Sequence, residues 1–64
     1  MVLTKGATLR LLEWASQKEK PVQRAFLEYY QKAAEYEEKE IGISVMTGQL
    51  VESIIREFEA LESR

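Results

Sequence analysis

Residues 42–62 read GISVMTGQLVESIIREFEALE and join a glycine turn to the most regular apolar stripe in the chain. The apolar positions recur every three or four residues, which is the period of one helix face. They are Leu50, Val51, Ile54, Ile55, Phe58 and Leu61. Ser44 or Thr47 can cap this helix, because a hydroxyl there accepts a backbone N–H hydrogen bond. The stretch predicts a helix over residues 46–62, preceded by a left-handed stop at Gly42.

Two further helices are predicted upstream. The first covers residues 6–18, with Thr4 or Thr8 as its cap and an apolar stripe that we expect at Leu9, Leu12 and Ala15, widened by Leu11 and Trp14. The second covers residues 21–41, because a proline such as Pro21 is suited to the first turn of a helix and not to its interior. We find no internal repeat in the sequence. The chain is predicted to be one all-α domain over residues 1–64, a three-helix bundle with a helix-turn-helix-like arrangement of helices 2 and 3, as a monomer or a dimer.

Composition excludes several classes of function. The chain has 64 residues with no cysteine and no histidine. These absences remove disulfides, most zinc sites and the commonest general base. We therefore expect no enzyme activity, no metal, no cofactor and no small-molecule substrate. No segment approaches the roughly 18 apolar residues of a membrane span, and the first residues lack a signal-peptide core, so we expect a cytoplasmic protein.

Charge is distributed unevenly along the chain. Residues 1–32 carry six basic and three acidic side chains, a balance of +3, whereas residues 33–64 carry three basic and eight acidic side chains, a balance of −5. These balances sum to the formal net charge of −2. A basic half favours an acidic partner, which is either a nucleic acid or the acidic half of a second copy.

The segment from Gly42 to Thr47 combines a glycine, an apolar residue, a serine and a threonine in the order typical of the turn in helix-turn-helix proteins. From Phe26 onward the chain resembles the winged-helix family, in particular the DNA-binding domain of archaeal origin-recognition initiators, without the wing. The resemblance also rests on the tyrosine-rich segment 26–30 and on the apolar positions from Val51 to Leu61.

The resemblance implies that the helix over residues 46–62 enters the major groove of double-stranded DNA. Its side chains nearest the DNA would be Thr47, Gln49, Ser53 and Arg56. Residues 45–62 depart from this expectation, because they carry four glutamates and one arginine. Phosphate contacts would then have to come from Lys18, Lys20 and Arg24.

A second apolar flank points to a different function. Leu27, Ala34 and Ile41 recur every seven residues, and Leu50 adds to them. We interpret this flank either as an interface for a homodimer or protein partner, or as a broad stripe inside a tightly wrapped bundle. Two functions therefore remain open: a small DNA-binding regulator or nucleoprotein accessory, and a helical interaction or oligomerisation module with no nucleic-acid contact.

Overall fold

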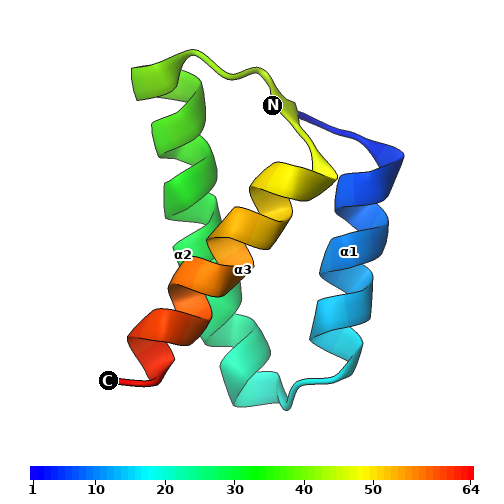
Figure 1. The fold of residues 1–64 in the computed structure, drawn as a ribbon, viewed down its shortest axis with the longest axis vertical. Helices are drawn as coiled ribbons and strands as arrows, with labels where there is room; N and C mark the ends of the chain where they lie inside the picture. The colour runs from blue at the N-terminus through cyan, green and yellow to red at the C-terminus, as the bar shows by residue number, and fades with distance from the viewer.

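The computed structural model covers residues 1–64 and consists of three helices with one very small strand pair (Figure 1). The elements in chain order are β1 (Val2–Leu3), α1 (Lys5–Ser16), α2 (Lys20–Tyr36), the π-helical turn η1 (Glu37–Ile41), β2 (Val45–Met46) and α3 (Gly48–Glu62). The predicted all-α class is confirmed. None of these helices combines the length and the apolar character that crossing a membrane requires.

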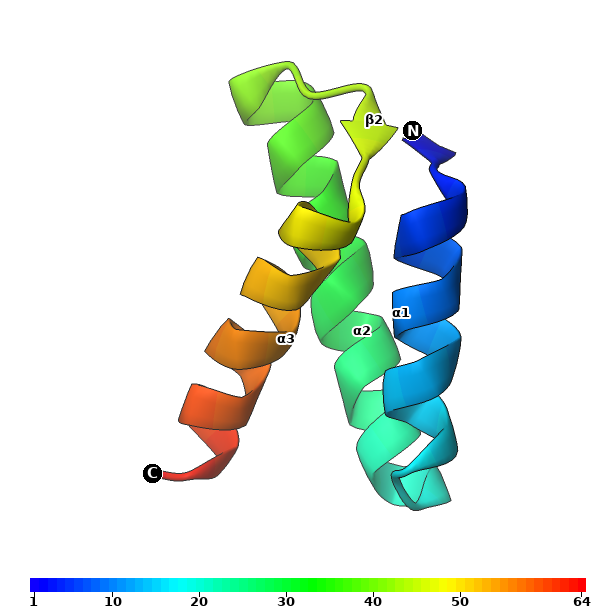
Figure 2. The ribbon, with the colours of Figure 1, turned by 45° about the vertical axis from the view of Figure 1, so that its right-hand side comes forward.

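The helices form an antiparallel pair, α1 and α2, with α3 lying across it (Figures 1 and 2). Both α1 and α2 pack on α3, but their backbones have little contact with each other. The helix order agrees with the prediction, and α2 and α3 are consecutive helices joined by residues 42–47. This connection is longer than the three or four residues of a typical helix-turn-helix turn, because it contains β2.

The helix ends follow local capping chemistry. The hydroxyl of Thr4 accepts a hydrogen bond from the Ala7 N–H at 3.1 Å, and that of Thr47 accepts one from the Leu50 N–H at 3.3 Å. The caps are therefore these two threonines and not Thr8 or Ser44. Gly42 has a φ of 82°, so its predicted left-handed conformation is confirmed. The first and third helices each differ from the predicted bounds by one or two residues.

The second helix changes its winding before it ends. The predicted helix over residues 21–41 is α-helical only to Tyr36 and continues as the wider turn η1. In this turn the Glu37 carbonyl oxygen accepts hydrogen bonds from two backbone N–H groups, those of Gly42 and Ile43. The wider turn therefore satisfies two donors with one acceptor at the point where the chain reverses.

A parallel strand pair joins the start of the chain to its second half, and sequence analysis did not predict it. Val2 pairs with Val45 and Leu3 with Met46. Each strand is followed directly by the threonine that caps the next helix. The pairing places the starts of α1 and α3 side by side: a Cβ atom at Gly48 would lie 3.6 Å from the Gly6 carbonyl carbon.

The core is built around one aromatic ring from each helix. The ring centroids of Trp14 and Phe26 lie 4.4 Å apart, and Phe58 lies 5.9 Å from the first and 5.3 Å from the second. The latter two contacts are edge-to-face, a favourable arrangement for aromatic pairs. Only eight side chains are buried, and α3 contributes four of them: Val51, Ile54, Ile55 and Phe58.

The predicted stripe of the first helix is wrong at Leu9 and Leu12, which are exposed. Of its other members, Trp14 is buried, and Leu11 and Ala15 pack against the core. The buried Ala7 was not predicted. Apolar residues surround most of α1, so its sequence permits more than one stripe. Packing of the indole ring on Phe58 selects the observed rotation and leaves two leucines outside.

We expect Phe58→Ala to lower the free energy of unfolding by about 3–5 kcal/mol, because it removes the ring that holds the other two in place. Leu61→Ala is the matched control: it lies on the same helix, 48% exposed, and should change stability by less than about 0.5 kcal/mol. Urea denaturation followed by far-ultraviolet circular dichroism measures both. Equal losses in the two variants would contradict this account of the core.

Candidate functional site

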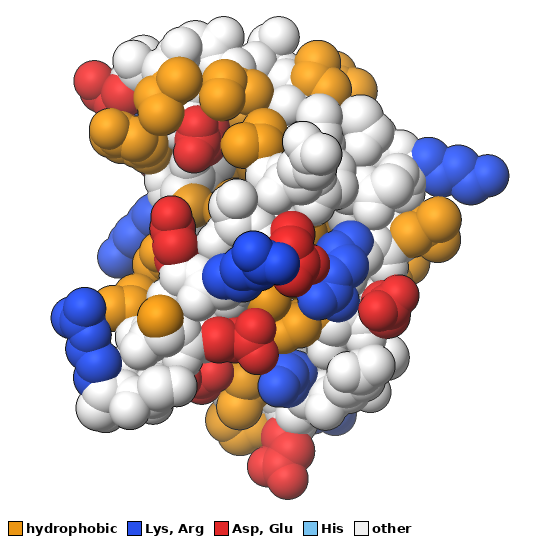
Figure 3. Space-filling model, in the orientation of Figure 1, with side chains coloured by type: hydrophobic (Ala, Val, Ile, Leu, Met, Phe, Trp, Pro, Cys, Tyr) orange, Lys and Arg blue, Asp and Glu red, His pale blue; other side chains and the backbone are white.

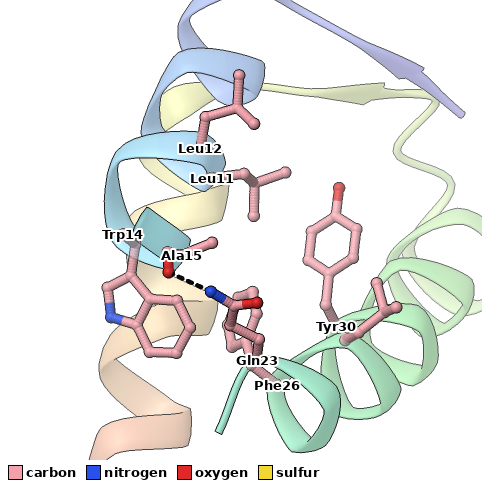
Figure 4. Close-up of a pocket in the computed structure, with 8 residues that line it drawn as sticks. Leu11, Leu12, Trp14, Ala15, Gln23, Phe26 and Tyr30 are labelled. Carbon is pink, nitrogen blue, oxygen red and sulfur yellow. Dashed lines mark hydrogen bonds between the residues drawn. The ribbon is translucent and has the colours of Figure 1, made fainter. Parts of the chain in front are cut away.

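An apolar groove lies between α1 and α2 (Figure 4). It has a volume of about 280 Å³, and seven of its eight lining residues are hydrophobic. The lining residues are Leu11, Leu12, Trp14, Ala15, Gln23, Phe26, Leu27 and Tyr30. The groove exists because the two helices contact α3 more than they contact each other.

The groove has a buried floor and an exposed rim. Trp14 and Phe26 are buried, whereas Leu12 is 63% and Leu27 54% exposed. Figure 4 places the side chains of Leu11 and Tyr30 on opposite helices, pointing toward one another across the hollow. Single exposed leucines are common, but a contiguous exposed apolar patch marks an interaction surface.

Gln23 is the one lining residue that is not hydrophobic, and its side-chain amide already forms hydrogen bonds within the chain. Its nitrogen donates to the carbonyl oxygens of Ala15 at 2.6 Å and Lys18 at 3.0 Å, which satisfies acceptors at the end of α1. Burial raises the pKa of the Tyr30 phenol, so this hydroxyl is neutral at ordinary pH. The groove thus offers apolar contact and one free hydroxyl.

The four predicted interface residues have different environments. Leu27 lines the groove and is exposed, and Ile41 is 55% exposed at the end of η1. Ala34 and Leu50 are half-buried and pack against the core. Sequence analysis assigned Leu11 and Leu12 to the stripe of the first helix and did not predict them as groove residues. The presence of apolar side chains on more than one side of that helix was the available signal.

The residues predicted to contact DNA come from α3, from the first turns of α2 and from the connection between α1 and α2. Thr47 uses its hydroxyl as a helix cap, and Gln49, Ser53 and Arg56 are exposed along α3. Lys20 and Arg24 lie in the first turns of α2, at the opposite end of the molecule from the start of α3 (Figure 1). Lys18 lies in the connection between α1 and α2.

Ion pairs neutralise the cations on the face shared by α1 and α3. Glu52 contacts Arg10 at 2.6 Å and Arg56 at 3.5 Å. Lys18 lies 4.0 Å from Glu59 and over the Trp14 ring. Figure 3 accordingly shows acidic and basic side chains alternating across the middle of this face. By contrast, Lys20 and Arg24 make no ion pair.

A second, more polar cleft of about 330 Å³ lies between α2 and α3 and includes Ser53. In it the Tyr29 hydroxyl donates to Glu57 at 3.0 Å, and one carboxylate oxygen of Glu37 is buried without a hydrogen-bond partner. Burial and the bond to Glu57 raise the pKa of Tyr29. The chain has no group of three or more acidic side chains placed to share a metal ion.

Comparison with protein-family models, with curated proteins and with solved structures finds no match. The resemblance to winged-helix domains therefore stays a prediction from the sequence.

The ion pair between Arg10 and Glu52 should make the stability of the fold depend on pH. The hydrogen bond from Arg10 lowers the pKa of Glu52 below the ordinary value. Its contribution to stability is therefore complete above the unfolded-state pKa of about 4.3 and is lost as the pH falls through the lowered, folded-state pKa. We expect Arg10→Gln to raise the pKa of Glu52 toward the ordinary value, as measured by carboxyl carbon NMR. Arg64→Gln, which removes an unpaired arginine, is the control; an unchanged Glu52 pKa in Arg10→Gln would refute the pairing.

Proposed function

We propose that this chain is a non-enzymatic helical module that binds a protein through the α1–α2 groove. The observation that carries the proposal is the exposure of Leu12 and Leu27 on the rim of a continuous apolar hollow. Burying apolar surface gains about 25 cal/mol per Å². A partner that covers both leucines would therefore gain free energy by removing apolar surface from water.

The form of the groove favours a helix as its occupant. Two antiparallel helices form its walls, and the apolar face of a third helix fits such a groove by inserting side chains at helical spacing. Small-molecule sites usually add several convergent polar groups to an apolar pocket. Here the Gln23 amide is engaged within the chain, which supports a protein partner over a small polar ligand.

Direct DNA binding is less well supported. A phosphate-binding surface needs cations that are free to replace counterions. On the α3 face, Arg56 and Lys18 are each close to a glutamate. The unpaired Lys20 and Arg24 lie in the first turns of α2, away from the start of α3, which carries Thr47 and Gln49 (Figure 1).

We expect a labelled random-sequence duplex to show no anisotropy change when it is titrated with the protein at low salt, because the α3 face is neutralised. A non-specific Kd of about 10⁻⁴ to 10⁻⁶ M with a steep salt slope would instead support the DNA-binding function. In that case Lys20→Glu with Arg24→Glu should abolish binding if these residues contact phosphate, and Gln49→Ala should test the start of α3.

The groove itself is tested by Leu12→Glu. We expect the wild-type chain to show one of two properties. It either self-associates or, if it is a monomer, enhances the fluorescence of the apolar dye anilinonaphthalene sulfonate. We expect Leu12→Glu to show neither property. Leu12 is solvent-exposed in the free chain, so the variant should fold normally. Leu61→Glu, an exposed leucine outside the groove, is the control. Retention of either property by Leu12→Glu would contradict the proposal.

A further inference from the structure

We propose that the occupant of the groove is a second copy of this chain, in a two-fold dimer whose α2 helices lie side by side and antiparallel. This inference rests on the proposed function, since it names the partner for the same groove. Three observations support it: the area that the chain leaves exposed, the distribution of charge along α2, and the absence of ion pairs for those charges.

The exposed area is large for the mass of the chain. Folded monomers of 7.4 kDa expose about 4,200 Å² on the usual scaling of surface with mass, whereas this chain exposes 4780 Å². The excess is about 600 Å² per chain, so burying it in two copies removes about 1,200 Å², the lower limit for a standard specific interface. A dimer of this size fits the surplus surface.

The charge on α2 changes sign along its length. Its first turns carry Lys20 and Arg24, whereas residues 35–41 carry four glutamates and one lysine. Of these glutamates, Glu35 and Glu40 are exposed and form no ion pair. In a two-fold interface the same surface occurs on both partners. An antiparallel arrangement therefore sets the basic end of each helix against the acidic end of the other, whereas a parallel arrangement would set like charges together.

The register that centres the two-fold axis near Tyr30 pairs residue i with a residue close to 60 − i. Arg24 then faces Glu35 of the other copy. Both side chains are exposed, and neither forms an ion pair within its own chain. Arg24, Leu27 and Glu35 are separated by three and eight residues, so they share one side of α2 with the groove rim.

Exchange of the Arg24 and Glu35 charges tests this arrangement. Arg24→Glu sets glutamate against Glu35 twice in each dimer, and Glu35→Arg sets arginine against Arg24 twice. We expect either variant alone to raise the dimer Kd at least roughly tenfold in sedimentation equilibrium, because two attractive pairs become repulsive. An equimolar mixture should recover the wild-type Kd, because both pairs in the heterodimer are attractive again.

Circular dichroism melts verify that both variants fold, and exchange of Arg64 for glutamate is the control for net charge. Single variants that dimerise like the wild type, or a mixture that does not recover dimerisation, would overturn the antiparallel arrangement. Loss of dimerisation in each variant and recovery in the mixture would support it.

Three further outcomes separate this inference from the proposed function. A wild-type chain that is monomeric at millimolar concentration but enhances dye fluorescence through Leu12 overturns the dimer and keeps the groove as a site for another protein. A monomer that does not enhance the fluorescence overturns both. A dimer that Leu12→Glu does not weaken also overturns both, because the contact then lies elsewhere.

Discussion

The contact among Trp14, Phe26 and Phe58 is the constraint on which the rest of the structure depends. Each ring comes from a different helix, and no other part of the small core joins all three helices so directly. Because α1 and α2 have little backbone contact with each other, the ring from α3 packs against both of their rings and completes the contact among the three helices. Since α3 packs on one face of the α1–α2 pair, the opposite face of the pair stays uncovered. The apolar groove is thus a direct result of how the core is built.

Electrostatics divides the surface in a related way. The cations that lie near α3 are neutralised within the chain, with Glu52 placed between Arg10 and Arg56. On α2, Arg24 and Glu35 stay without partners. The face that covers the core is therefore electrostatically satisfied, whereas the helix beside the groove keeps charges free for a second molecule. Apolar surface and unpaired charge occur on the same helix.

Local signals explain what the sequence predicted well. The α3 stripe, the left-handed Gly42 and the threonine caps depend on neighbours within a few residues, so pattern and residue chemistry identify them. Two features depend on distant contacts and were missed. The β1–β2 pair joins segments that are only two residues long and far apart in the sequence, and the rotation of α1 is set by rings on other helices. Of the candidate groove residues, only Leu27 was predicted, because its seven-residue spacing to Ala34 could be recognised without knowing how α1 packs.

The β1–β2 pair also indicates whether the three helices are assembled. Strands of two residues are too short to persist alone, and parallel strands cannot be joined by a tight turn. The hydrogen bonds from the Val2 N–H to Ser44 and from the Thr4 N–H to Met46, each 3.0 Å long, therefore form only when the intervening helices are assembled. Both amide protons lie within four residues of the chain start, where fraying would ordinarily leave them open to solvent exchange. The exchange rates of these two amide protons alone are therefore enough to follow the assembly of all three helices.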